Sequence, residues 1–500
     1  MSDPILCARI HALEEQLTVV ENSPKWLETM PFRTTEIGEE LHDGLDGTFG
    51  TKARQEKREL QAILNELRAA ERGSADDAAA AIRAGWERYL RVQQESQEIF
   101  SECLQFLGGV AIRNEGFEQI LDNQIWEVAD ELIRSCARES TGYPWTSLTV
   151  PAPEEAVAKT LARMIRLRFP DWNVWTIPLA AREYGHVVAE DVAGLVAFID
   201  REVEDLVRGR LEEIVAIELA THVLHNPLSE DDERALRATL MASAEDAAEH
   251  LERPPGRLVQ VQTTDEELDA RVRDYVADTA SRERERLHIL VADVFATYSM
   301  GIAYAAPAIL LRFGPGRRTR EDVVSDAERG EVVLAMLDRM DREATGSPYR
   351  ALLDRLREDW SWVLDHVPTT HGFRAADGYS AVFVDKVWAI FDAHLRTTAR
   401  YPHDADSEGW LSVRKVQLAW QASHKASGEF TTTDLELRKL RDALNAAWAW
   451  RLENPADEQT VKRLENAVTE ICRGLVADGR RAGGRRRRTG QRASGPARRT

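Results

Sequence analysis

The residues with the clearest chemical potential lie within positions 168–190, in the stretch RFPDWNVWTIPLAAREYGHVVAE. Residues 183–186, EYGH, match the second half of an H-E-x-x-H helix. In that motif two histidines one helical turn apart bind the same metal ion, and the glutamate beside the first activates a metal-bound water. Arg182 occupies the first histidine position. Because a guanidinium stays protonated and has no lone pair to donate, Arg182 cannot serve as a ligand.

A second informative stretch, residues 287–307, carries Asp293 in the pattern D-x-F-A-T-Y, followed by G-x-A-Y. Together the two stretches make the chain resemble uncharacterised bacterial proteins with a gluzincin-like zinc metallopeptidase domain. The family pattern has a W-x-x-W-x-x-P lead-in, then H-E-aromatic-G-H, then a helix with E-x-x-x-D-x-F-A-T-Y and G-x-A-Y. The matching residues, within about 150–345, are Trp172, Trp175, Pro178, 183–186, Asp293, 295–298, Gly301, Ala303 and Tyr304.

The departures from this family pattern concern the metal ligands. The resemblance implies a third zinc ligand, a glutamate four residues before Asp293, and Ile289 stands at that position. With Arg182 at the first histidine position, two of three expected ligands are absent. His186 and a nearby Glu183 would hold zinc far more weakly than a three-ligand catalytic site does. The sequence therefore predicts a pseudoenzyme with no metal cofactor.

The loss of a dication has an electrostatic consequence for the carboxylates that remain. Glu183 and Asp293 would lie close together in a buried site, where like charges raise each other's pKa or destabilise the fold. Arg182 can supply the missing positive charge. We therefore expect its guanidinium to bridge Glu183 and Asp293 where the family has zinc.

A competing interpretation keeps the chain an active zinc peptidase with variant ligands. In it His186, His288 and Asp293 bind zinc and Glu183 is the general base. Helical geometry disfavours this set, because five residues span about 500° and leave His288 and Asp293 roughly 140° apart on a straight helix.

Another histidine pair, His222 and His225 with Glu218 one turn earlier, could share one helix face. No second helix offers matching ligands, so we expect these side chains to have structural roles. The sequence contains neither G-x-x-x-x-G-K-S/T nor G-x-G-x-x-G, the usual phosphate-binding loops.

Charge is distributed unevenly along the 500 residues. Acidic residues outnumber basic ones 85 to 65, yet residues 480–500 contain nine arginines and no acidic residue. The remainder therefore carries 56 basic and 85 acidic side chains, a net charge of −29, which disfavours nucleic acid binding by the body. Polyanion binding is expected only through the arginine-rich tail, with Arg485, Arg486, Arg487 and Arg488 at its centre. Alternatively, this tail binds acidic faces of the protein itself.

Cysteine usage and hydropathy indicate the compartment. The four cysteines are far apart in the chain and form no Cys-x-x-Cys pair, which is typical of reduced thiols. The first twenty residues lack the pattern of a secretory signal, so we expect a cytoplasmic protein. The uncharged run 294–311 includes Pro307 and barely reaches membrane-spanning length, so it is predicted to be a buried helix.

Apolar residues recur at helical spacing almost throughout, which predicts an all-α or nearly all-α, multi-domain protein. Only residues 257–262 alternate like a strand. The predicted parts are a helical hairpin or coiled-coil-like region at 1–140, a linker at 141–153, a metallopeptidase-like helical domain at 154–346, a tryptophan-rich helical domain at 347–478 and a disordered arginine-rich tail at 479–500. Tryptophans of the fourth part are expected in its core.

These observations favour a non-catalytic protein that works as a scaffold or regulator through protein–protein binding. Long N-terminal hairpins suit that role. The alternatives are the variant zinc peptidase and polyanion binding through the tail, and the latter would weaken steeply with salt.

Overall fold

The computed structural model describes most of the chain. The described residues are 4–22, 46–70, 72, 75–114, 124–142, 149–152, 156–158, 164–168, 173–225, 229–249, 266–314, 323–346, 350–366, 379–401, 408–431, 437, 439–454 and 457–492. The fold is predominantly helical, as predicted. The expected strand at 257–262 lies outside the described residues.

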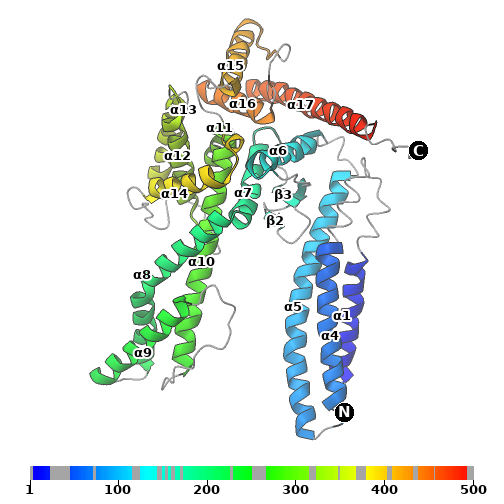
Figure 1. Cartoon of the computed structure of the whole chain (residues 1–500), viewed down its shortest axis with the longest axis vertical. Helices are drawn as coiled ribbons and strands as arrows, with labels where there is room; N and C mark the ends of the chain where they lie inside the picture. Colours follow the sequence, from blue (N-terminus) through cyan, green and yellow to red (C-terminus); the bar gives the residue numbers. More distant parts are fainter. Residues whose placement is uncertain are drawn as a thin grey trace, which may run out of the picture.

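The N-terminal helices form a bundle with a hydrophobic core of its own (Figure 1). In the helix at Thr51–Ala70 apolar residues recur every three or four positions from Leu60 onward. Its buried face carries Leu60, Ile63, Leu64 and Leu67. Such a stripe stabilises a helix mainly by packing against neighbours. The elements are α1 (Pro4–Glu21), the short π-helix η1 (Asp46–Gly50), α4 (Thr51–Ala70) and α5 (Ala75–Asn114). The predicted hairpin is the antiparallel pair α4–α5.

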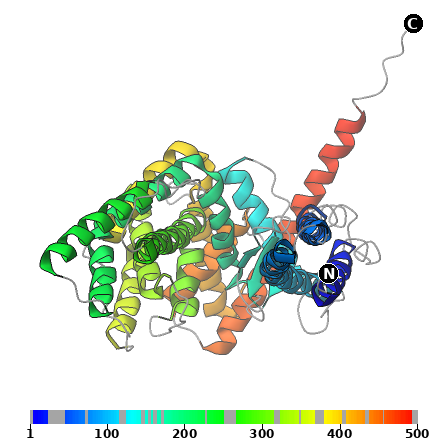
Figure 2. The ribbon, with the colours of Figure 1, turned by 90° about the horizontal axis from the view of Figure 1, so that it is seen from below.

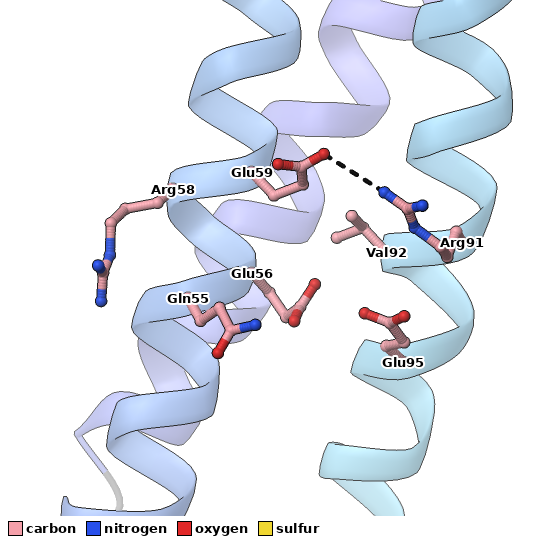
Figure 3. Close-up of a pocket in the computed structure, with 7 residues that line it drawn as sticks. All are labelled: Gln55, Glu56, Arg58, Glu59, Arg91, Val92 and Glu95. Atoms are coloured by element: carbon pink, nitrogen blue, oxygen red, sulfur yellow. Dashed lines mark hydrogen bonds and ion pairs between the residues drawn. The ribbon is translucent and has the colours of Figure 1, made fainter. Parts of the chain in front are cut away.

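One polar residue interrupts the buried stripe of α4. Glu56 is only 7% exposed and lies opposite Glu95 of α5 (Figure 3). Burial, followed by the charge of Glu95 and a hydrogen bond between the two carboxyl groups, raises the pKa of Glu56 to about 7. Ionisation of Glu56 at higher pH is therefore expected to destabilise the bundle.

The substitution Glu56→Gln is expected to stabilise the bundle above pH 7. The folded state holds the Glu56 proton up to about pH 7, whereas the unfolded chain loses it near the ordinary glutamate pKa of 4.5. Stability from this group therefore falls as pH rises between these values. Above pH 7, Gln should gain about 1–2 kcal/mol. Hydrogen exchange of α4 and α5 amides at pH 8 and pH 4 measures this difference, which should vanish at pH 4. Glu98→Gln, at an exposed position of α5, is the control, and equal protection of both variants at pH 8 would contradict the prediction.

The rest of the helices share a second, larger core that extends from Ile125 to Val476. Figures 1 and 2 show these helices as one body beside the N-terminal bundle. Its longer elements are α6 (Gln124–Ser140), α7 (Ala180–Asp191), α8 (Ala193–His225), α9 (Glu230–Glu249), α10 (Glu266–Met300), α12 (Asp326–Glu343), α13 (Arg350–His366), α14 (Tyr379–His394), α15 (Glu408–Ser427), α16 (Leu440–Glu453) and α17 (Glu458–Arg492). Four short elements connect them: η2 (Ile177–Leu179), α11 (Ile302–Pro307), η3 (Ala308–Arg312) and η4 (Thr397–Ala399).

This single core changes the predicted domain organisation. Helix α6 packs into the larger core, so the N-terminal unit ends before residue 140, between α5 and α6. The expected boundary near residue 346 does not separate two cores, because helices on both sides contribute to the same cluster. Arg441 of α16 reaches Glu139 of α6 at 2.8 Å, so an ion pair also links distant parts of this body.

A small three-stranded sheet lies where the sequence predicted a linker and the start of a helical domain. The strands are β1 (Thr149–Ala152), β2 (Ala156–Ala158) and β3 (Met164–Arg168), in the order β1-β3-β2. β3 pairs parallel with β1, with Thr149 opposite Ile165, and antiparallel with β2. Two hydrogen bonds hold the first residue of β1 against α6. Asp130 of α6 accepts them from the backbone amide and the hydroxyl of Thr149.

The tryptophan-rich segment contributes mostly to the core, as predicted. Trp360, Trp388, Trp420, Trp448 and Trp450 are buried. Among the tryptophans of this segment whose exposure the structure describes, Trp362 is the exception at 62% exposed, because it lies two residues after the buried Trp360 and so points to the opposite face of the helix. Trp448 also donates a hydrogen bond from its indole nitrogen to the Trp175 carbonyl, which joins α16 to the residues before α7.

The uncharged run 294–311 is buried, as expected. It forms the end of α10, then α11 and part of η3, and most of its side chains lie in the core. Within the described ranges, no helix combines the length and apolarity that crossing a bilayer requires.

The arginine-rich tail differs from the prediction. Helix α17 continues through Arg492, whereas disorder was expected from residue 479. Arginine and alanine are good helix formers, so turns with little to bury can extend a helix that is already nucleated by buried turns before them. Residues 493–500 lie outside the described part of the chain.

Candidate functional site

The candidate site forms where α7 crosses α10. The closest approach is at Gly185, where a Cβ atom would lie 2.7 Å from the Ala292 carbonyl oxygen. This contact, available only to glycine, brings the first half of α7 against the C-terminal third of α10. Glu183 on α7 and Asp293 on α10, 2% and 0% exposed, are thereby buried on facing helices.

Arg182 bridges the two carboxylates, as the sequence analysis predicted. One terminal nitrogen donates to Glu183 Oε1 at 2.8 Å, and Nε lies 3.2 Å from Asp293 Oδ1. The Arg182 side chain is 16% exposed, so these contacts lie in a largely dry environment. Burial and the neighbouring Arg329 lower the pKa of Arg182, but the two carboxylates outweigh them and the net shift is upward.

Asp293 has two further partners that the sequence analysis did not anticipate. Arg329 donates from Nε to Oδ2 at 2.8 Å and from a terminal nitrogen to Oδ1 at 3.2 Å. The Tyr304 hydroxyl donates to Oδ1 at 2.5 Å. The two guanidinium groups offset the charges of Glu183 and Asp293, so that neither buried carboxylate is left without a cation.

A break in the buried segment places Tyr304. Gly301 has φ of 62°, which separates α10 from α11 and is accessible to glycine at little cost. Asn445 of α16 spans the break, accepting from the Ala303 amide and donating to the Met300 carbonyl. The chain thus turns back so that the Tyr304 hydroxyl reaches Asp293.

Helix α12 places Arg329 in its first turn. Ser325 caps this helix by accepting from the Glu328 amide, which fixes where it begins. Asp326 contacts a terminal nitrogen of Arg329 at 2.9 Å, and the guanidinium carbon lies 4.4 Å from the Phe313 ring centre. Arg329 is therefore held by a second carboxylate and by an aromatic face.

The electrostatics keep Asp293 ionised. Burial raises the pKa of Asp293, but Arg329, Arg182 and the hydrogen bonds from Arg329 and Tyr304 lower it further, to below its ordinary value. The pKa of Tyr304 rises well above its ordinary value through burial and the Asp293 charge. A carboxylate with a depressed pKa is a poor general base. Asp293 thus suits a structural ion pair better than proton transfer.

The structure does not assemble the variant zinc ligands. His288 Nδ1 lies 4.0 Å from Glu190 Oε1 on α7, while Asp293 is engaged by arginines. Ile289 packs against the hydrophobic core. Within the described residues, no group of three or more His, Cys, Asp or Glu side chains is placed to hold a metal ion. The residues present at this site do not fit a zinc centre, because a guanidinium lies between the carboxylates.

Glu218 and the arginine-rich segment do not belong to this site. Glu218 pairs with Arg271 of α10 at 3.2 Å, which gives it a structural role. His186 is partly buried on α7. The segment with Arg485, Arg486, Arg487 and Arg488 belongs to α17, away from the Arg182 cluster.

Sequence reasoning missed Arg329 because it lies 36 residues from Asp293. Only a count of buried charges could have indicated a second cation, because Glu183 and Asp293 carry two negative charges and Arg182 supplies one positive charge. Tyr304 was visible as part of G-x-A-Y, but not as a partner of Asp293.

Comparisons with protein-family models, with curated proteins and with solved structures found no match for this chain.

Proposed function

We propose that the chain is a metallopeptidase-like but non-catalytic protein that acts as a scaffold or regulator through protein–protein binding. In it an ion-pair cluster takes the place of the metal centre. The observation that carries this proposal is the position of the Arg182 guanidinium, which contacts both Glu183 and Asp293.

Chemistry at this position supports the same conclusion. A peptidase of this type needs an open metal position and a carboxylate free to accept a proton from water. Here Glu183 is tied to Arg182, and both Asp293 oxygens accept hydrogen bonds. The network instead connects four helices, α7, α10, α11 and α12, and so rigidifies the body that would present binding surfaces.

Metal analysis of the purified full chain tests the non-catalytic assignment. After equilibration with zinc and removal of unbound ions, elemental mass spectrometry should find zinc far below one equivalent. The variant Arg182→His/Ile289→Glu restores both expected ligands and should bind close to one equivalent. The matched control Arg182→Gln/Ile289→Gln has similar bulk without those ligands and should remain zinc-free.

Stoichiometric zinc in the unaltered chain would overturn the proposal and favour the variant peptidase. If the variant with both restored ligands also failed to bind zinc, the proposal that the ion-pair cluster takes the place of a metal centre would be contradicted. Circular dichroism melting of each variant verifies that the comparison is made between folded proteins.

A further inference from the structure

A hollow of about 490 Å³ lies between α4 and α5 in the N-terminal bundle (Figure 3). Its lining residues are Gln55, Glu56, Arg58, Glu59, Arg91, Val92 and Glu95. The Glu56 and Glu95 carboxyl groups point toward one another across it. This is a solvent-accessible groove with an acidic floor.

Of the two arginines of this groove, one is paired with a glutamate that also lines it and the other points away from it. Arg91 contacts Glu59 at 3.5 Å, and Glu59 is also paired with Arg88. Arg58 points away from the hollow and donates from Nε to the Arg54 carbonyl.

Glu56 is a buried carboxyl group whose charge is only partly offset, because the nearby Arg91 lowers its pKa but burial and Glu95 raise it more. It is 93% buried, it faces the hollow, and its hydrogen-bonding neighbour is another carboxyl group, Glu95. Among the described side chains, none with a positive charge forms an ion pair with it. A guanidinium entering from outside would find two carboxylates that one planar fork can bridge. In the larger body of this molecule, one guanidinium already bridges two carboxylates in this way, since Arg182 contacts both Glu183 and Asp293.

The chain itself contains a matching cationic segment. Residues 480–500 hold nine arginines and no acidic residue, while the rest of the chain has a net charge of −29. Helix α17 carries part of this segment out of the body through Arg492. In Figures 1 and 2 the end of α17 lies beyond the upper end of the bundle and points away from it, not alongside α4 and α5. In this arrangement the end of α17 does not lie against the α4–α5 groove of its own copy.

We propose that the α4–α5 groove binds the arginine-rich end of α17 from a second copy of this chain. The contact is heterologous, because a groove on one copy takes a helix end from another. The inference rests on the proposed role in protein–protein binding and names a partner for it.

Sedimentation velocity of the full chain tests the contact. At low salt and tens of micromolar protein, we expect association that is lost at high salt, since exposed charges are screened. Glu56→Gln/Glu95→Gln should weaken association at least tenfold without unfolding the bundle. Glu98→Gln, on the same helix but outside the groove lining, should associate as the unaltered chain does.

A mixing experiment identifies the two halves of the contact. Replacement of Arg485, Arg486, Arg487 and Arg488 by Gln should also abolish self-association. A mixture of this tail variant with the groove variant should form a heterodimer, because each supplies the half that the other lacks. Circular dichroism verifies that both variants are folded.

Three outcomes would overturn the inference. These are a monomeric unaltered chain at low salt, unimpaired association of the groove variant, and failure of the mixture to form the heterodimer. Each of them leaves the zinc measurement unaffected, so failure here is distinguishable from failure of the non-catalytic assignment.

Discussion

Arg182→Ala is expected to lower the free energy of unfolding by about 3–5 kcal/mol, the usual cost of removing one partner from a buried ion pair. Glu183, 2% exposed, would lose the guanidinium that contacts it at 2.8 Å. Asp293 would keep its contact with Arg329 but lose the second of its two arginine partners. Urea unfolding followed by circular dichroism measures the difference.

Two comparisons separate this effect from a general loss of an arginine. Arg208→Ala removes an exposed partner of Glu204 and should cost at most about 0.5 kcal/mol. Arg182→Met/Glu183→Gln removes both charges and should recover most of the loss, because no buried carboxylate is left without its partner. If Arg182→Ala unfolded at the same urea concentration as the unaltered protein, the bridging role would be refuted.

Gly185→Ala is expected to cost about 3 kcal/mol or more, at the upper end of overpacking effects. The new Cβ would lie 2.7 Å from the Ala292 carbonyl oxygen and 2.9 Å from its Cα. Because these are backbone atoms, no side-chain rotation relieves the contact, and α7 must move away from α10. That movement would also separate Arg182 from Asp293. Thermal unfolding of the variant measures the cost.

Gly209→Ala is the matched control for this substitution. Gly209 lies within α8, where a Cβ would meet nothing within 4 Å. Alanine in such an open helical position should stabilise the protein by about 0.5–1 kcal/mol. A Gly185→Ala variant as stable as Gly209→Ala would show that the helix crossing tolerates a side chain.

Local patterns were sufficient to predict the helical fold and the Arg182 bridge. Helical periodicity depends on neighbouring residues, so it is visible without tertiary contacts. The bridge followed from a local substitution at position 182 combined with the need to neutralise two carboxylates. The sheet was missed because its strands are only three to five residues long, too short for a pattern to distinguish them from loops.

The sequence by itself determined which residue types are available: helices with apolar faces, an arginine at position 182 beside Glu183, an isoleucine four residues before Asp293, and an arginine-rich end. Only the tertiary structure decided that Arg329 and Tyr304 complete the cluster, that one core joins residues 125 to 476, and that Glu56 faces Glu95. The physical reason is that helix crossings bring together residues far apart in sequence. The charge balance of a buried site is settled only when all of those residues are in place.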